Sequence, residues 1–134
     1  MVSISAAWTS EQLDRIETAD ELQIAVRRED GTLRRLLPIW VVRVEDSVYV
    51  RTWHRRDTGW FGHVLTTRRA HIRVPGVEVD VAVEEVGDGP TGLRAAVDAA
   101  YRAKYGRYGR SSVDAMVADA AVASTLRLVP ERSG

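Results

Sequence analysis

The sequence contains no cysteine, so a disulfide framework, a thiolate metal site and a cysteine nucleophile are all excluded. Lysine is almost absent as well, since Lys104 is the only one among 19 basic residues. No apolar run approaches the roughly 18 residues that a membrane-spanning helix needs. The first residues, MVSISAAW, lack the basic start and the apolar stretch of a signal peptide. We therefore expect a cytoplasmic protein that does not bind membranes.

Neither sign of charge dominates, because 19 basic residues are balanced by 19 acidic ones. A neutral chain lacks the broad positive field that general nucleic-acid binding requires, so a nucleic-acid partner is not expected. With 134 residues, 45% hydrophobic and 28% charged, the chain has the composition and length of one globular domain covering residues 1–134.

Periodicity in the sequence predicts a small antiparallel barrel. Apolar and polar residues alternate over 22–26, 48–53, 70–74 and 77–83, as in half-buried strands, and a short strand is expected at 126–128. Residues 36–44 are almost continuously apolar, which predicts one strand covered on both faces. Helical spacing predicts helices starting at Thr9-Ser10, over 59–67, over 93–105 and over 111–123. This order predicts a mainly β (α+β) antiparallel barrel with packed helices.

The segment from Arg51 to Arg73 is the exception to the overall neutrality. It holds six arginines and one acid, Asp57, together with all three histidines. Arginines bind phosphate through paired donors, and a helix beginning near Gly59 would add backbone N–H groups. The segment therefore predicts a site for a small anionic ligand with a planar ring, although solvated arginines and core tryptophans would give the same pattern. The residues that would form the site are Arg51, Thr52, Trp53, Arg55, Arg56 and Trp60.

Other motifs carry less information. Gly87–Gly92 matches the glycine spacing of dinucleotide-binding loops, but the preceding strand alternates valine with acids and a second helix follows the first, so we expect a loop. His54, His63 and His71 are too far apart in sequence to form a paired-histidine metal motif, and no metal site is expected. No nucleophile elbow is present. We interpret the acids of strand 77–83 as a solvated face.

The run PIWVVRVEDSVYVRTW, followed by GW, the valine-alternating strand, AAYRAKYG and TLRLVP, resembles a family of short uncharacterised prokaryotic proteins. The resemblance extends from Trp8 to Pro130. That family is distantly similar to the flavin- and deazaflavin-binding split β-barrels, which include pyridoxamine-phosphate-oxidase-like proteins and deazaflavin-dependent nitroreductases. The resemblance implies a split β-barrel, FMN or deazaflavin as the cofactor, and a homodimer with the cofactor at its interface.

Carried onto this sequence, the resemblance implies that Val50, Arg51 and Thr52 line the edge of the isoalloxazine ring. Arg55 and Arg56 would approach the phosphate, and Trp60 would open the helix beside it. The chain departs from the oxidase pattern, because His54-Arg55-Arg56 stands where Ser-x-Lys usually follows the third strand. Lys104 is expected to serve helix packing. The sequence identifies no catalytic acid or base.

These observations lead to a first hypothesis, a split-barrel oxidoreductase that uses a flavin or deazaflavin to act on a small organic substrate. A second hypothesis keeps the barrel without a cofactor, as a small-molecule binder or enzyme of specialised metabolism that uses the barrel pocket. A third is a nucleic-acid module with Trp53, Trp60 and Phe61 as stacking platforms, which the local nature of the positive charge disfavours.

Overall fold

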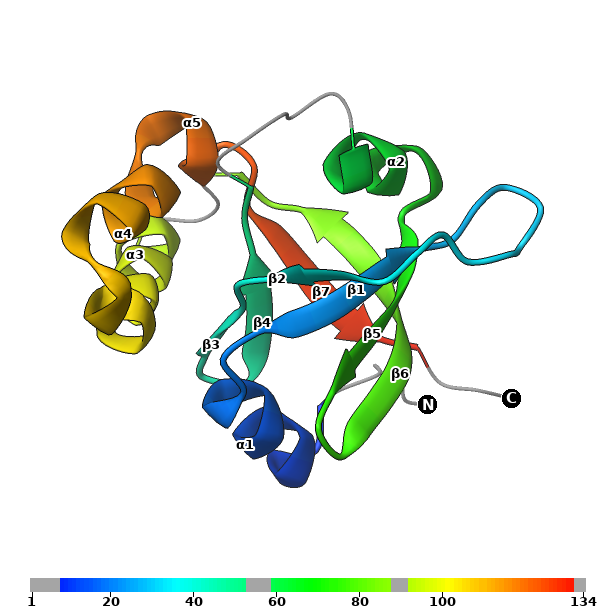
Figure 1. The fold of residues 1–134 in the computed structure, drawn as a ribbon, viewed down its shortest axis with the longest axis horizontal. Helices are drawn as coiled ribbons and strands as arrows, with labels where there is room; N and C mark the ends of the chain where they lie inside the picture. Colours follow the sequence, from blue (N-terminus) through cyan, green and yellow to red (C-terminus); the bar gives the residue numbers. More distant parts are fainter. Residues whose placement is uncertain (1–7, 53–58, 88–91, 132–134) are drawn as a thin grey trace.

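The structure, a computed structural model, describes residues 8–52, 59–87 and 92–131. Within these residues the chain forms seven strands, five α-helices and one 3-10 helix (Figure 1). The strands are β1 (Leu22–Val26), β2 (Leu37–Ile39), β3 (Val42–Val44), β4 (Ser47–Val50), β5 (Arg69–Val74), β6 (Val77–Glu85) and β7 (Leu126–Pro130). The helices are α1 (Ser10–Thr18), α2 (Gly59–Thr67), α3 (Leu93–Tyr105), η1 (Gly106–Tyr108), α4 (Arg110–Val117) and α5 (Asp119–Val122).

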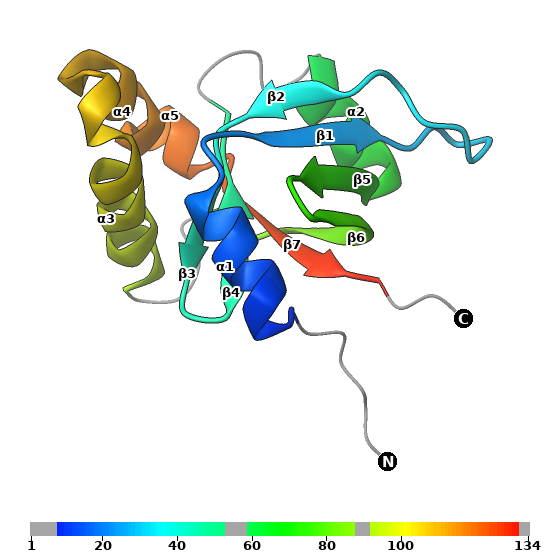
Figure 2. The same ribbon diagram turned by 60° about the horizontal axis from the view of Figure 1, so that its bottom comes forward.

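All seven strands belong to one antiparallel sheet with the order β2-β1-β5-β6-β7-β4-β3. The two edge strands, β2 and β3, are neighbours in sequence and are separated only by Trp40 and Val41. Three Cα-to-Cα steps span at most roughly 11 Å, so both edges of the sheet must lie close together. The sheet therefore curls into a barrel, as Figure 2 shows, and the predicted fold class is confirmed.

The prediction of one strand over 36–44 that is covered on both faces is wrong. The chain turns at Trp40 and Val41 and passes from one edge of the sheet to the other, which divides the segment into two strands. Val41 packs inside the barrel, whereas Val42 packs outside it against the helices. Val41 and Val42 are the buried residues of this segment, and the edge position of β2 explains why the exposed Pro38 is tolerated.

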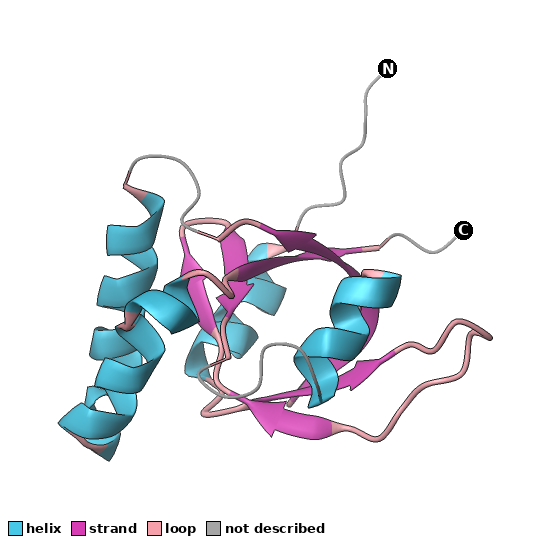
Figure 3. Ribbon diagram, turned by 90° about the horizontal axis from the view of Figure 1, so that it is seen from above, coloured by secondary structure: helices cyan, strands magenta, loops and turns pink. Residues whose placement is uncertain are grey.

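Two hydrophobic cores hold the molecule together. The barrel interior is filled by inward-facing strand residues and by Leu13 and Ile16 of α1 and Phe61 and Val64 of α2. The second core lies between the outer face of β3 and β4 and the helical layer α3–α5, which Figure 3 shows on one side of the barrel. Its buried members are Val42, Tyr49, Val97, Tyr101, Tyr105, Val113, Met116 and Val117.

Most predicted helices are confirmed. α1 begins at the expected capping box, in which the Thr9 side chain accepts a hydrogen bond from Gln12 N and the Gln12 side chain accepts one from Thr9 N. α2 has the predicted bounds, Gly59–Thr67. The single helix predicted over 111–123 is instead interrupted at Ala118, whose backbone is extended, and forms α4 and α5. No helix in the described ranges is long and apolar enough to cross a membrane.

The last turn of α3 fastens the junction between the barrel edges. The Tyr105 hydroxyl accepts a hydrogen bond from Val41 N at 3.0 Å and lies 2.8 Å from Asp20 O. Lys104 Nζ donates to Ile16 O at 3.1 Å and to Val41 O at 2.9 Å, and burial lowers the pKa of Lys104 to about 8. Lys104 and Tyr105 thus connect α3, α1 and the β2–β3 link, which agrees with the expected packing role of the lysine.

We predict that Tyr105→Phe destabilises the fold by about 1–3 kcal/mol, because the buried N–H of Val41 would lose its partner. Urea denaturation measures the loss. Tyr108→Phe is the matched control, since Tyr108 is exposed and its hydroxyl bonds only to Arg107 among the described residues. Equal stability of the Tyr105→Phe and Tyr108→Phe variants would contradict the importance of the Tyr105 contact.

Candidate functional site

The end of β4 carries the first two residues of the predicted site. β4 pairs with β3 on one side and with β7 on the other. Because successive side chains of a strand point to opposite faces of the sheet, those of β4 alternate between the barrel interior and the helical layer. Val48 and Val50 point into the barrel, while Tyr49 packs among the helices. Continued past Val50, this alternation places Arg51 on the same side as Tyr49, towards the helical layer.

Arg51 is the largest fully buried side chain in the described part of the molecule. Its Nη1 donates to Asp98 Oδ1 at 2.6 Å and to Met116 O at 2.9 Å, and its Nε donates to Thr125 Oγ1 at 2.8 Å. The side chain of Arg51 has no exposed area and that of Asp98 is 22% exposed. A charge this deeply buried is tolerated because the ion pair and the two further bonds replace its hydration.

An aromatic ring completes the environment of Arg51. The guanidinium carbon lies 5.5 Å from the centre of the Tyr101 ring, within cation–π range. Burial raises the pKa of the Tyr101 hydroxyl, which stays protonated. Among the described residues, Arg51 Nη2 is buried and makes no hydrogen bond. Arg51 therefore keeps one unused donor but does not present its charge to solvent.

Thr52 is buried and fixed by the residues that precede β7. Its backbone N–H donates to Ser124 Oγ at 3.0 Å, and the same hydroxyl lies 3.0 Å from Thr52 O. Thr125, the next residue along the chain, receives the bond from Arg51. The two residues before β7 thus hold both Arg51 and Thr52, and they fix the direction in which the chain leaves β4.

The remaining predicted site residues are not brought together by the described structure. Trp53, Arg55 and Arg56 lie outside the described residues, as does His54. Trp60 lies in the first turn of α2, where the sequence placed it. The convergence of these side chains on one ligand stays a prediction.

The fit of this region to a flavin phosphate can be tested on Arg51. A phosphate-binding arginine needs free donors and an uncompensated charge, whereas the Arg51 charge is already neutralised by Asp98. Arg51 is thus suited to positioning the end of β4. Direct contacts with the phosphate would be made by Arg55 and Arg56, which follow Arg51 in the sequence. Sequence reasoning missed Asp98, Ser124 and Thr125, although an acid on the apolar face of a predicted helix, next to Val97, was a usable signal.

A second polar cluster lies on the outer face of β5 and β6. His71 lies between two carboxylates, with Nδ1 2.8 Å from Asp80 Oδ1 and Nε2 2.8 Å from Glu78 Oε2. Arg27 Nη2 also donates to Asp80 Oδ1, at 2.9 Å. Partial burial by itself lowers the pKa of His71, but the bonds to Glu78 and Asp80 outweigh it and the pKa is raised. The bond to His71 lowers the pKa of both carboxyls. These acids are therefore more than the solvated face that we expected.

Histidine and carboxylate groups suggest a metal only when three or more converge. In the described ranges no such group of potential ligands is found. His71 is occupied by the hydrogen bonds just described, and His63 is exposed on α2.

The fold and this site define a class of protein, the split β-barrel with a helical layer on one side. The chain belongs to the family described as "Uncharacterized protein conserved in bacteria (DUF2255)", whose model matches residues 12–128. This result confirms the family resemblance read from the sequence. A search of curated proteins gave no significant match.

Solved structures of the same fold include flavin-binding proteins. The heme storage protein HutZ from Vibrio cholerae has a TM-score of 0.67 and 14% identity, over 90% of this chain and 87% of HutZ. An FAD-binding protein from Mesorhizobium loti has a TM-score of 0.60 and 15% identity, over 97% and 95% of the two chains. A pyridoxamine 5'-phosphate oxidase-related, FMN-binding protein from Nostoc punctiforme has a TM-score of 0.50 and 14% identity, over 88% and 75%. At these identities the comparison establishes the fold.

We predict that Asp98→Ala destabilises the protein by about 3–5 kcal/mol, because it leaves the buried charge of Arg51 uncompensated. Urea denaturation provides the measurement. Asp114→Ala is the control, since Asp114 forms an exposed ion pair with Arg102 and its loss is expected to cost less than about 1 kcal/mol. Losses of similar size in both variants would contradict the burial argument.

The His71 cluster predicts a pH-dependent contribution to stability. Because the pKa of His71 is raised in the folded state, its contribution is fully present below its unfolded pKa and is lost as the pH rises through the folded value. The difference in unfolding free energy between wild type and His71→Gln should therefore shrink from about pH 5.5 to about pH 8.5. A difference that is constant or grows over this range would refute the charged state of His71.

Proposed function

We propose that this protein binds a flavin or deazaflavin where β4 leaves the barrel, and that it is an oxidoreductase acting on a small organic substrate. The observation that carries the proposal is the likeness of the whole fold to an FAD-binding protein over 97% of this chain and 95% of the other. The FMN-binding neighbour supports the same class of cofactor. The cationic segment that begins at Arg51 adds chemical support from the sequence.

In this proposal Arg51 and Thr52 act as positioning residues. The Arg51–Asp98 ion pair and the Thr52–Ser124 hydrogen bonds fix the end of β4 from inside the protein. The residues that leave this fixed point, Trp53 to Arg56, are then directed by a rigid support, and rigid support is what an accurate binding site requires.

The ligand contacts are assigned to the residues that the sequence singled out. Arg55 and Arg56 would hold the phosphate through charge-assisted hydrogen bonds, and Trp53 and Trp60 would offer flat surfaces to the ring. When bound, the cofactor supplies the electron-transfer chemistry, while the protein binds and orients it. A homodimer, in which the partner subunit completes the site, is part of the proposal.

A fluorescence titration tests this proposal. Addition of FMN, FAD or deazaflavin should quench the tryptophan fluorescence saturably, because two of the four tryptophans belong to the proposed site. The double variant Arg55→Gln/Arg56→Gln should bind at least tenfold more weakly, since each charge-assisted bond contributes about 1.5–3 kcal/mol. Arg102→Gln is the control, because Arg102 is exposed on α3 and pairs with Asp114.

Two results would contradict the proposal. The first is the absence of saturable quenching with all three cofactors, which would favour the cofactor-free binder or enzyme. The second is an equal loss of cofactor binding in the double variant and in the Arg102→Gln control. That result would show that the cofactor does not bind at the cationic segment.

A further inference from the structure

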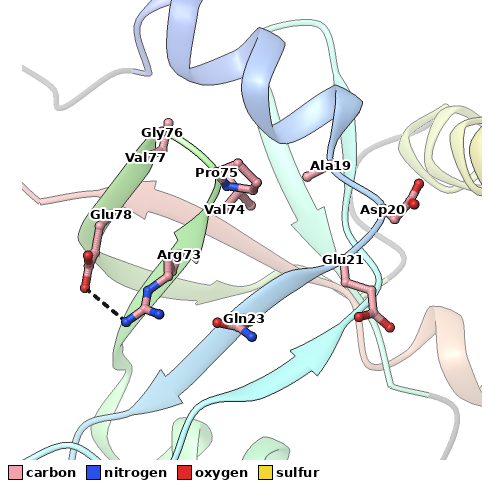
Figure 4. A pocket seen from close by; sticks show the side chains of 10 residues that line it. All are labelled: Ala19, Asp20, Glu21, Gln23, Arg73, Val74, Pro75, Gly76, Val77 and Glu78. Carbon is pink, nitrogen blue, oxygen red and sulfur yellow. Dashed lines mark ion pairs between the residues drawn. The ribbon is translucent and has the colours of Figure 1, made fainter.

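A hollow in the described part of the molecule lies away from the β4 exit. It has a volume of about 670 Å³ and lies between the α1–β1 junction and the β5–β6 turn, at the end of the barrel opposite α2 in Figure 1. Small-molecule sites usually have volumes of about 300–1,000 Å³. Figure 4 shows its lining: Ala19, Asp20, Glu21, Gln23, Arg73, Val74, Pro75, Gly76, Val77 and Glu78.

Two of the acids in this lining are already engaged. Asp20 forms an ion pair with Arg107. Glu78 bonds to His71 at 2.8 Å, and that bond lowers the pKa of Glu78, which is therefore ionised near neutral pH. Neither carboxylate depends on the hollow for a partner.

Three exposed polar groups in the lining remain uncommitted. The guanidinium of Arg73 donates no hydrogen bond to any described residue, and its one ion pair there is the loose contact with Glu78 Oε2 at 3.9 Å. Among the residues that the structure describes, Glu21 also forms no ion pair and the side-chain amide of Gln23 forms no hydrogen bond. By contrast, Arg27, which follows β1, donates to Asp80, and Arg69 of β5 donates to Glu131. The lining of the hollow thus contains a loosely paired cation, Arg73, together with the carboxylate of Glu21 and the amide of Gln23.

The sheet register places these groups on one surface. Gln23 of β1 is directly opposite Arg73 of β5, so their side chains project from the same face as neighbours. Glu21 precedes Gln23 by two residues and lines the same hollow. In Figure 4, Gln23 lies between Arg73 and Glu21. The lining of the hollow therefore offers a small ligand both a guanidinium and a carboxylate.

We propose that this hollow binds a small zwitterion of the amino-acid class. The ligand carboxylate pairs with Arg73, the ligand ammonium pairs with Glu21, and the Gln23 amide donates to one and accepts from the other. Arg73 is available because Glu78 retains its bond to His71 when the loose contact with Arg73 is exchanged. Pro75, which is exposed in the lining, adds apolar surface for an aliphatic side chain.

The test uses ¹⁵N-labelled full-length protein and a panel of glycine, L-leucine, L-glutamate and L-lysine as probes. We expect at least one of them to shift the amide resonances of Gln23, Gly76 and Glu78 saturably at about millimolar concentration or below. Arg73→Gln and Glu21→Gln should each weaken this binding at least tenfold. Arg102→Gln should leave it unchanged, because Arg102 lies on α3. Unchanged thermal unfolding of the exposed-site variants checks that they fold.

Charge-deleted analogues of leucine decide between a zwitterion site and a simple ion site. The analogue 4-methylpentanoate lacks the ammonium, and 3-methylbutylamine lacks the carboxylate. Both should bind more weakly than L-leucine if leucine is the probe that saturates. No saturable shift with any amino acid, equal binding of an analogue, or binding that survives both Arg73→Gln and Glu21→Gln would overturn the proposal. The outcome is independent of flavin binding, since the two sites share no residue.

Discussion

Two residues join the edges of the curled sheet, and the rest of the structure depends on that link. Trp40 and Val41 carry the chain from one edge of the sheet to the other. Tyr105 binds the N–H of Val41 and Lys104 binds its carbonyl, while the Trp40 and Tyr105 rings stack 4.1 Å apart. β2 and β3 remain the edge strands of the curled sheet, and the short link between them keeps these two edges close together.

The same helix carries this constraint to the β4 exit. Lys104 and Tyr105 hold the link between the edges, and Asp98 and Tyr101, one to two turns earlier on α3, surround Arg51. α3 therefore contacts both the β2–β3 link and the end of β4 and holds them in a fixed relation. Residues that follow Arg51 start from a point fixed by buried polar contacts. This is the physical basis on which a binding site outside the barrel could be precisely oriented without being part of its core.

Local patterns in the sequence predicted most helices and strands, but they did not predict which residues distant in sequence would be in contact. The alternation of valines over 77–83 and the capping box at Thr9 depend on neighbouring residues, so both could be read directly. The division of 36–44 into two edge strands depends on which strands lie beside them, and an apolar run does not contain that information. The partner of Arg51 lies 47 residues further along the chain, so counting charges near Arg51 suggested a free cation. The helix carrying Asp98 was predicted, but not its packing against β4.

The proposal that this split barrel binds a flavin-type cofactor is tested most directly by an absorbance spectrum of the protein purified from its native host. We expect the near-ultraviolet and visible bands of a flavin or deazaflavin in the protein fraction, at a constant ratio to protein through successive columns. A colourless protein that also fails to acquire these bands after incubation with FMN, FAD and deazaflavin and removal of the unbound cofactor would contradict it.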